Sequence, residues 1–409
     1  MKILIYGGSF NPPHLGHVRS VQMAAEAIRP DKIYLIPAAI PPHKSLPEDS
    51  ATAEQRLAMT ELAAGEIPGA EVLDMELRRS GKSYTVDTLR ALRQENPAAE
   101  LVFLLGTDMF LSLETWREPE AIVSLAKVAL FPREQGREKE IEAKRRELEA
   151  RYDTHFLVLP GAPVEISSTE LRAALKARRG RDHIPAPVYA YIIRHGLYGA
   201  KPDFVWLRQN AYTYLKPKRV PHVQGAEQEA IRLAKRWGCS WEDAAEAAIC
   251  HDITKRLGLE EQLRLCARYG IMADDYEKVS EKLLHAKTGA AFAQDLFGLP
   301  EHIAEAIRWH TTGRAGMNTL QQVIYLADYI EPTRSGFAGL EELRQAAYED
   351  LDVAMERGLR MSLDDVISRG NAPHVDSIQA ERWFLTRLHE KGAKPVRIPK
   401  IPDPEELDI

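Results

Sequence analysis

The residue types best suited to chemistry in the first half of the chain stand directly after a short apolar run, Lys2–Tyr6. They are two glycines, a small polar and an aromatic residue, and two histidines, in the order Gly7, Gly8, Ser9, Phe10, His14 and His17. Glycines after a first parallel strand let a phosphate come close to the backbone, and the start of the following helix favours anions. Two imidazoles at a helix start can both donate hydrogen bonds to one triphosphate. A pair of zinc ligands, or two incidental loop histidines, is the alternative interpretation.

A second polar run lies near the end of this half and consists of Ile166, Ser167, Ser168, Thr169, Glu170, Leu171 and Arg172. Its hydroxyls are expected to cap a helix, with Glu170 and Arg172 in the first turn. Alone, this is an ordinary serine N-cap. Together with the glycine and histidine run, it resembles the nucleotidyltransferase superfamily. That resemblance implies that the histidines and the distal run hold the phosphates of ATP.

Three further segments are similar to nicotinate-mononucleotide adenylyltransferases. They are Pro41–Lys44, Ser83–Leu89, and Gly106–Asp108 with Trp116. Physical roles fit each one: Lys44 supplies a cation for an anionic mononucleotide, amides near Thr85 hold a carboxylate, and Trp116 stacks on a pyridine ring. Asp108 is expected to accept from ribose hydroxyls, and Arg133 to contact phosphate. Taken singly, Lys44 reads as a surface lysine and Trp116 as a core residue.

The implied reaction is adenylyl transfer, with His14, His17 and Arg172 as catalytic residues. The phosphate of nicotinate mononucleotide attacks the α-phosphorus of ATP in line and pyrophosphate leaves, so that positioning and charge stabilisation supply most of the catalysis. Mg²⁺ is expected to accompany ATP. Another acceptor, such as phosphopantetheine, is a second interpretation, which Pro41–Lys44 and Ser83–Leu89 disfavour.

The second half holds imidazoles and carboxylates on or beside apolar helical stretches, namely His222, His251, Asp252, His285, His310 and Asp328. Any one of these histidines alone is an ordinary core or surface residue. Together they form a plausible metal cluster. Because no thiolate joins them, the ions that fit are Fe, Mn, Mg, Zn or Co.

The order of these residues resembles the HD-domain metal phosphohydrolases. The phrases His251–Lys255 and Tyr325–Arg334 are similar to the YqeK-type subgroup, which splits diadenosine tetraphosphate symmetrically to ADP. The resemblance implies one or two divalent ions, iron first, with water as the nucleophile and Asp252 as the most important ligand. Lys255, Thr311 and Arg334 are candidates for phosphate contacts or for residues behind the ligands. A non-catalytic metal or nucleotide sensor is the alternative, and a pure scaffold binding neither ATP nor metal is a further one.

The elements that must position these groups differ between the two halves. In the first, strand-like runs (Lys2–Tyr6, Lys32–Pro37, Leu101–Leu105, Lys127–Phe131, His155–Leu159) alternate with helical patterns (Val18–Ala27, Glu54–Ala64, Val86–Gln94, Ser168–Ala177), which predicts a Rossmann-like α/β fold with a parallel sheet. The charged run Arg137–Arg151 is expected to be a solvated surface helix. The second half predicts an all-α bundle. We expect domains at 1–198 and 219–391, a linker at 199–218 and a flexible tail at 392–409.

The composition sets the remaining bounds. The chain has 409 residues, 44% of them hydrophobic, and a formal net charge of −6, which disfavours a protein that lives on nucleic acid. Its cysteines, Cys239, Cys250 and Cys266, form no CxxC pair, and no apolar run reaches the ~20 residues that cross a bilayer. A cytoplasmic enzyme of small nucleotides is expected, without a membrane partner. Its oligomeric state is open, a homo-oligomer included.

Overall fold

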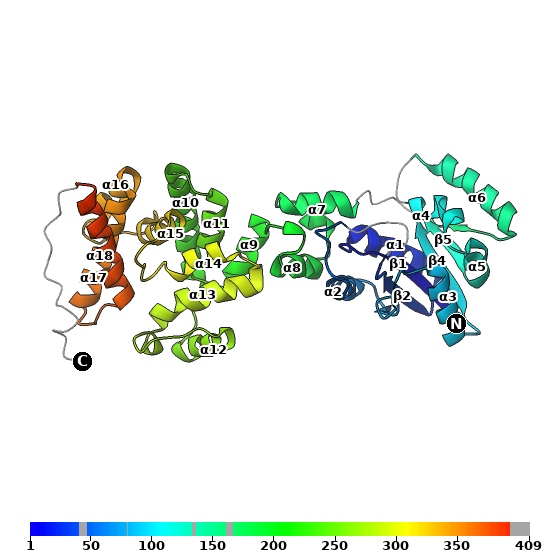
Figure 1. Ribbon diagram of the computed structural model, residues 1–409, viewed down its shortest axis with the longest axis horizontal. Helices are drawn as coiled ribbons and strands as arrows, with labels where there is room; N and C mark the ends of the chain where they lie inside the picture. The colour runs from blue at the N-terminus through cyan, green and yellow to red at the C-terminus, as the bar shows by residue number, and fades with distance from the viewer. Residues whose placement is uncertain (41–46, 80, 133–135, 161–166, 393–409) are drawn as a thin grey trace. The chain divides into compact units, whose positions relative to one another are not determined.

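The computed structural model describes residues 1–40, 47–79, 81–132, 136–160 and 167–392, and it divides the chain into two units, Met1–Asp203 and Phe204–Ile409 (Figure 1). None of the described helices is long and apolar enough to cross a membrane.

The first unit is built on a parallel sheet with the strand order β3-β2-β1-β4-β5-β6. The strands are β1 (Lys2–Gly8), β2 (Lys32–Pro37), β3 (Ala70–Val72), β4 (Glu100–Gly106), β5 (Lys127–Phe131) and β6 (Leu157–Val158). The helices are α1 (Leu15–Ile28), α2 (Ala53–Ala64), α3 (Thr85–Glu95), α4 (Thr107–Leu111), α5 (Pro119–Leu125), α6 (Glu138–Tyr152), α7 (Ser168–Lys176) and α8 (Ala186–Arg194). This order reverses between β1 and β4, and parallel α/β sheets bind ligands at the carboxyl ends of the strands at such a point.

Helices cover both faces of a parallel sheet, so its strands carry apolar residues on both sides. Ile3 and Ile5 of β1 pack in one cluster with residues of α3, α5 and α6, including Val86 and Leu148. Helices α1 and α2 contact β5 and β2. The expected α/β fold is therefore confirmed.

The expected elements fall close to the observed ones. Lys32–Pro37 and Lys127–Phe131 are strands as expected, and the charged run Arg137–Arg151 is helix α6 with Ile141 and Leu148 buried. The sequence did not reveal β3, an edge strand of three residues with no apolar run. The strand expected at His155–Leu159 is shortened to Leu157–Val158.

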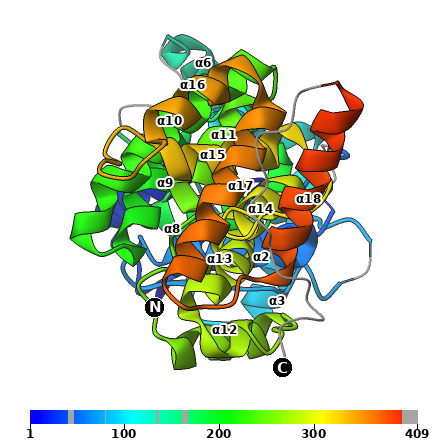
Figure 2. The same cartoon turned by 90° about the vertical axis from the view of Figure 1, so that its left-hand side faces the viewer.

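The second unit is helical throughout its described part, as expected. Its helices are α9 (Phe204–Ala211), α10 (Val220–Trp237), α11 (Trp241–Cys250), α12 (Leu259–Tyr269), α13 (Glu281–Phe297), α14 (Glu301–Arg308), α15 (Thr319–Ile330), α16 (Leu340–Glu349), α17 (Leu351–Ser368) and α18 (Val375–Glu390). Helix α10 packs against α11 and α15, and α17 packs against α18 (Figure 2). The apolar faces of these helices share one core that includes Ala230, Ile249 and Val323.

The segment expected to be a linker, 199–218, differs from that description. Helix α9 occupies Phe204–Ala211, and short 3₁₀ turns follow at Tyr212–Tyr214 and Pro217–Arg219. Leu207 and Ala211 are fully buried in the core of the second unit. The division after Asp203 therefore places most of this segment inside the helical unit, because its few apolar residues have a core to pack against. Residues 393–409 of the expected tail lie outside the described residues.

Candidate functional sites

The first site forms where β1 ends and α1 begins, at the carboxyl edge of the sheet. Gly7 and Gly8 are the last residues of β1, and Phe10 follows with its ring buried. A Cβ on Gly8 would lie 3.3 Å from the Phe10 ring, so a larger residue here would require this ring to shift. The loop therefore brings the backbone of Gly8 and Ser9 to the point where the order of the strands reverses.

His14 and His17 lie together at the start of α1. His14 is the N-cap residue, its side chain is 2% exposed, and the two ring centroids are 3.7 Å apart. The backbone N–H of His14 donates to His17 Nδ1 at 3.1 Å. Because Nδ1 accepts this bond, the proton of neutral His17 is on Nε2, from which it can be donated to a phosphate oxygen.

The distal run meets this loop in space. Ser167 caps α7 by accepting from the N–H of Glu170, and the Ser168 hydroxyl donates to Pro12 O at 3.4 Å. Arg172 donates from Nη1 to Asn11 O at 2.9 Å, and its side chain is buried. Thr169 accepts from Arg172 Nη2 at 3.4 Å. The structure thus brings the two expected ATP-binding segments together at one end of α1.

Sequence reasoning missed the residues that hold this loop in place. Tyr198 donates its hydroxyl hydrogen to Asn11 Oδ1 at 2.8 Å, and burial raises the pKa of Tyr198. Arg56, on α2, is 1% exposed and donates to three backbone oxygens, those of Ser9 (2.8 Å), Ala38 (2.6 Å) and Ala39 (3.0 Å). Arg56 therefore ties the glycine loop to the segment that follows β2. In the sequence it stands in a helical pattern like any surface arginine.

The structure gives less support to the residues expected to bind the mononucleotide than to those expected to bind ATP. Thr85 begins α3, next to the loop after β2, since Ser83 Oγ accepts from the N–H of Ala39 at 3.1 Å. Asp108 is exposed and accepts from Arg137 Nη1 at 3.0 Å. Trp116 is 8% exposed and packs edge-on against Phe103 in the core, so its stacking role stays a prediction. Lys44, Arg133 and Ile166 lie outside the described residues.

The second site gathers all the expected metal ligands of the helical unit. His222 lies in the first turn of α10, His251 and Asp252 follow α11, His285 is in α13, His310 follows α14, and Asp328 is in the last turns of α15. Five of the six are buried and Asp328 is nearly so; Asp252 is 0% exposed. Two of the three-residue groups suited to a metal ion come from this set: His222 with His251 and Asp328, and His251 with Asp252 and His310.

The carboxylate of Asp252 divides the histidines into two pairs. Its Oδ2 lies 3.3 Å from His251 Nε2 and 3.8 Å from His222 Nε2. Its Oδ1 lies 3.3 Å from His285 Nε2 and 3.8 Å from His310 Nε2. Asp252 and the four histidines would be the residues that hold a divalent ion here.

The donor set fits a divalent ion. Nδ1 of His251, His285 and His310 donates to the backbone oxygen three residues earlier, at 2.7, 2.6 and 2.6 Å respectively. The proton of each neutral imidazole is therefore on Nδ1, which leaves the lone pair of Nε2 for a metal. The Nε2 atoms and the carboxylate oxygens face one another at 2.9–3.8 Å.

The electrostatics of this cluster follow from burial and from the paired charges. Burial lowers the pKa of His285 and His310, and Lys255 adds to the effect at His285, so both rings stay neutral as metal ligation requires. Burial opposes ionisation of Asp252, but His251 and His285 hold its pKa well below the ordinary value. Burial also lowers the pKa of His251, and Asp252 outweighs this and raises it.

Cationic and hydroxyl groups surround the cluster. Lys255 Nζ lies 2.9 Å from His285 Nε2, Thr311 Oγ1 lies 3.3 Å from His310 Nε2, and Arg334 Nη2 donates to Asp328 Oδ1 at 3.0 Å. The structure therefore places all three expected neighbours at the cluster. Arg219, which sequence reasoning passed over, donates from Nε to Asp252 Oδ2 at 2.5 Å.

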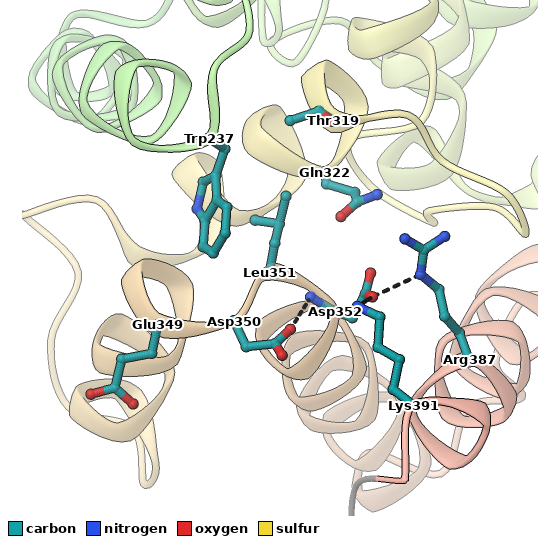
Figure 3. Close-up of a pocket in the computed structure, with 9 residues that line it drawn as sticks. All are labelled: Trp237, Thr319, Gln322, Glu349, Asp350, Leu351, Asp352, Arg387 and Lys391. Atoms are coloured by element: carbon teal, nitrogen blue, oxygen red, sulfur yellow. Dashed lines mark hydrogen bonds and ion pairs between the residues drawn. The ribbon is translucent and has the colours of Figure 1, made fainter.

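Two other places in the helical unit could be taken for binding sites: an acidic cluster with a histidine, and a hollow between the ends of helices. Asp274, Glu277 and His374 lie close enough to share an ion, but Asp274 accepts from His374 Nε2 at 2.7 Å and Glu277 pairs with Lys287 at 2.5 Å. A hollow of about 280 Å³ lies where α10 and α18 end and α15 and α17 begin (Figure 3). Several of its polar groups have structural partners: Asp350 caps α17, and Asp352 accepts from Arg387 and Lys391.

Comparisons with known proteins match a family to each of the two units. Residues 5–174 match the cytidylyltransferase-like family and residues 219–333 match the HD domain. A protein of Aeromonas salmonicida named "probable nicotinate-nucleotide adenylyltransferase" is 40% identical over 209 residues, which are 48% of this chain and 96% of that one.

Two further proteins are similar to this chain. A Mycoplasma pneumoniae protein named "probable nicotinate-nucleotide adenylyltransferase/Ap4A hydrolase" is 29% identical over 332 residues, 81% of this chain and 89% of that one. A Clostridium acetobutylicum protein of known crystal structure, named "predicted HD superfamily hydrolase involved in NAD metabolism", is 33% identical and covers 46% of this chain and all of that one, with a TM-score of 0.44. In its first unit the chain belongs to the nicotinate-nucleotide adenylyltransferase family, and its second unit contains an HD domain at residues 219–333.

Proposed function

We propose that the chain is bifunctional: the first unit transfers AMP from ATP to nicotinate mononucleotide, and the HD domain hydrolyses a nucleotide phosphoanhydride. The observation that carries the first activity is the meeting of Arg172 with the loop that leads into His14 and His17. The relatives that match this unit over nearly their whole length bear the name of that activity.

In the first reaction an oxygen of the mononucleotide phosphate bonds to the α-phosphorus of ATP, the bond to the β-phosphate breaks, and pyrophosphate leaves. His17 donates from Nε2 to the α-phosphate, while His14 and Arg172 hold the remaining phosphates. The amides at the start of α3 and α7 add partial positive charge, and Mg²⁺ enters with ATP. Arg56 and Tyr198 keep the loop in the geometry that in-line attack requires.

The test of this activity is a substrate panel on the full chain with ATP. Nicotinate mononucleotide, nicotinamide mononucleotide and phosphopantetheine are offered in turn, and the adenylylated product and pyrophosphate are measured. The proposal expects deamido-NAD from nicotinate mononucleotide as the main product. A preference for phosphopantetheine would overturn it.

For the HD domain we propose the symmetrical hydrolysis of diadenosine tetraphosphate to two ADP. The support is the complete set of buried histidines and carboxylates, and the name of the Mycoplasma relative that spans both units. One or two divalent ions, with iron as the first candidate and Mn, Mg, Co or Zn as the others, would supply the positive charge that makes an anhydride phosphorus open to attack by water. Lys255, Thr311 and Arg334 would bind the phosphate oxygens or orient the ligands.

The alternative is an HD domain that senses metal or nucleotide without catalysis. Metal analysis of the purified full chain, followed by a hydrolysis panel with diadenosine tetraphosphate, ATP and ADP, separates the two. Formation of ADP in the amount of two per tetraphosphate supports the hydrolase. Binding of the nucleotide with no product in the presence of each metal supports the sensor.

A further inference from the structure

One histidine of the HD site is held differently from the other three. His251, His285 and His310 each donate Nδ1–H to a backbone carbonyl, whereas Nδ1 of His222 lies 3.0 Å from the carboxylate oxygen Oε1 of Glu331. Glu331 was not among the residues expected from the sequence. Its side chain is fully buried, directly behind a ligand.

Glu331 and Asp328 hold His222 from both sides. Asp328 Oδ1 lies 2.9 Å from His222 Nε2, and Glu331 Oε1 takes the other ring nitrogen. A carboxylate at Nδ1 can only accept, and with the ring proton held there the lone pair of Nε2 would be offered to a cation in the cluster. One short segment of chain at the end of α15 therefore supplies both a ligand and the group that orients a second ligand.

The carboxylate of Glu331 is itself fixed by its neighbours. Thr333 donates its backbone N–H to Oε2 and its hydroxyl to Oε1, both at 2.6 Å. Arg344 donates to the backbone oxygens of Ile330 and Glu331 at 3.0 Å. These hydrogen bonds restrict movement of the Glu331 carboxylate away from His222. The outer partner of a metal-bound histidine needs such a fixed position.

Helix α10, which carries His222, leaves room for the Glu331 carboxylate only because residue 225 is glycine. A Cβ built on Gly225, one turn after His222 in α10, would collide with Glu331 Oε2, and Glu331 Cδ would be 3.3 Å away. Alanine is more favourable than glycine in a helix interior, so Gly225 lowers the stability of α10 locally. The space that the Glu331 side chain needs explains why glycine stands there.

We propose that Glu331, seated against Gly225, is a positioning residue of the HD metal centre that fixes the tautomer and orientation of His222 and thereby sets how tightly the centre binds its ion. Glu331 contributes no ligand atom; it acts through His222, and its charge makes that imidazole a stronger donor to a cation. The inference rests on the proposed metal-dependent function of this site.

The test uses Co²⁺ as the probe on the full chain stripped with a chelator, without nucleotide. Affinity and stoichiometry are measured by calorimetry, and histidine ligation by visible absorption. Glu331→Gln is expected to weaken Co²⁺ binding about 10-fold and Glu331→Ala about 100-fold, with altered absorption bands, because outer partners of metal ligands carry effects of this size. Glu342→Gln, a change at an exposed carboxylate of α16, is the matched control and should bind as the wild type does.

A second arm tests the seat itself. Gly225→Ala should weaken Co²⁺ binding in the wild-type background but cause little further loss when combined with Glu331→Ala, because the collision then disappears. Far-ultraviolet circular dichroism of the metal-free variants checks folding, and if Glu331→Ala does not fold, Glu331→Gln and Gly225→Ala carry the test.

Wild-type affinity and spectrum in both Glu331 variants would overturn the inference while leaving the proposed function standing. If the wild-type chain itself binds no Co²⁺, the proposed metal centre fails and the inference fails with it.

Discussion

Arg172 donates a hydrogen bond to the backbone oxygen of Asn11 at 2.9 Å, although 161 positions separate the two residues in the chain. The bond joins the start of α7 to the loop between β1 and α1. Together with the bond from Ser168 to Pro12 O, this contact brings together two segments that each resemble an ordinary helix start. Arg172 therefore braces the loop that carries His14, and we propose that its charge also serves ATP.

Arg172→Lys keeps the positive charge and loses the planar fork that reaches both Asn11 and Thr169. We expect kcat/KM for ATP to fall about 100-fold, the size of effect seen when one preorganised donor to a developing charge is lost. Steady-state kinetics with varied ATP measure this. Arg179→Lys, at an exposed arginine shortly after α7, should leave the kinetics unchanged. Equal losses in both variants would contradict a specific role for Arg172.

Arg56→Met leaves partly buried carbonyl oxygens at Ser9, Ala38 and Ala39 without this donor. Each unsatisfied buried group costs roughly 1–3 kcal/mol, so the free energy of unfolding of the first unit should fall by at least about 2 kcal/mol. Urea unfolding followed by circular dichroism gives this value. A variant as stable as the wild type, with unchanged kcat/KM for ATP, would contradict the role of Arg56 as the anchor of the glycine loop.

The carboxyl of Glu76 is expected to make the free energy of unfolding depend on pH. Burial raises the pKa of its carboxyl, although Thr88 and Ser83 donate to it. The folded protein then holds this proton more tightly than the unfolded chain, so stability falls as pH rises through the folded-state pKa. Glu76→Gln should therefore raise the free energy of unfolding at pH 8, with the gain disappearing near pH 4, below the ordinary glutamate pKa of about 4.3. Glu71→Gln, at an exposed position of β3, is the control; a gain that is the same at both pH values would show that ionisation of Glu76 is not its cause.

The sequence left open whether Lys255 contacts a phosphate or supports the metal ligands. Its ammonium lies 2.9 Å from His285 Nε2 and 3.7 Å from Asp252 Oδ1, so it repels a cation bound there and attracts a phosphate. Lys255→Met is expected to raise KM for diadenosine tetraphosphate about 10-fold while Co²⁺ binds at least as tightly as to the wild type. Weaker Co²⁺ binding with unchanged KM would instead make Lys255 a support for the ligands.

Metal binding should stabilise the helical unit alone. At a free ion concentration 100 times the dissociation constant, one site adds about 2.7 kcal/mol to the free energy of unfolding. Differential scanning calorimetry with and without Mn²⁺ should show the gain in one transition, and Asp252→Asn should abolish it. An equal shift in both variants would place the bound ion elsewhere.

Residue type and order predicted which side chains come together in the helical unit. Each histidine alone is ordinary, but the set of imidazoles and carboxylates is unusual, and all six expected ligands meet in the HD domain. The parallel sheet followed from alternating strand and helix patterns, whereas β3 was missed because an edge strand of three residues carries no apolar run.

The residues behind the sites could not be predicted in the same way. Arg56 and Glu331 act through neighbours 17 to 109 positions away in the chain, and nothing local marks an arginine that binds three carbonyl groups or a glutamate that orients a histidine. Leu207 and Ala211 were read as linker because the prolines around them hid a short helix whose core partners lie far along the chain.

The measurement that tests the central claim most directly is the rate at which the full chain and its Asp252→Asn variant convert diadenosine tetraphosphate to ADP, with deamido-NAD synthesis assayed on the same samples. We predict that the variant loses hydrolysis by about 1,000-fold or more, as expected when several kcal/mol of charge stabilisation are removed, and makes deamido-NAD at the wild-type rate. Hydrolysis at an equal rate in both proteins, or no ADP from either, would contradict a bifunctional enzyme with its second active site at Asp252.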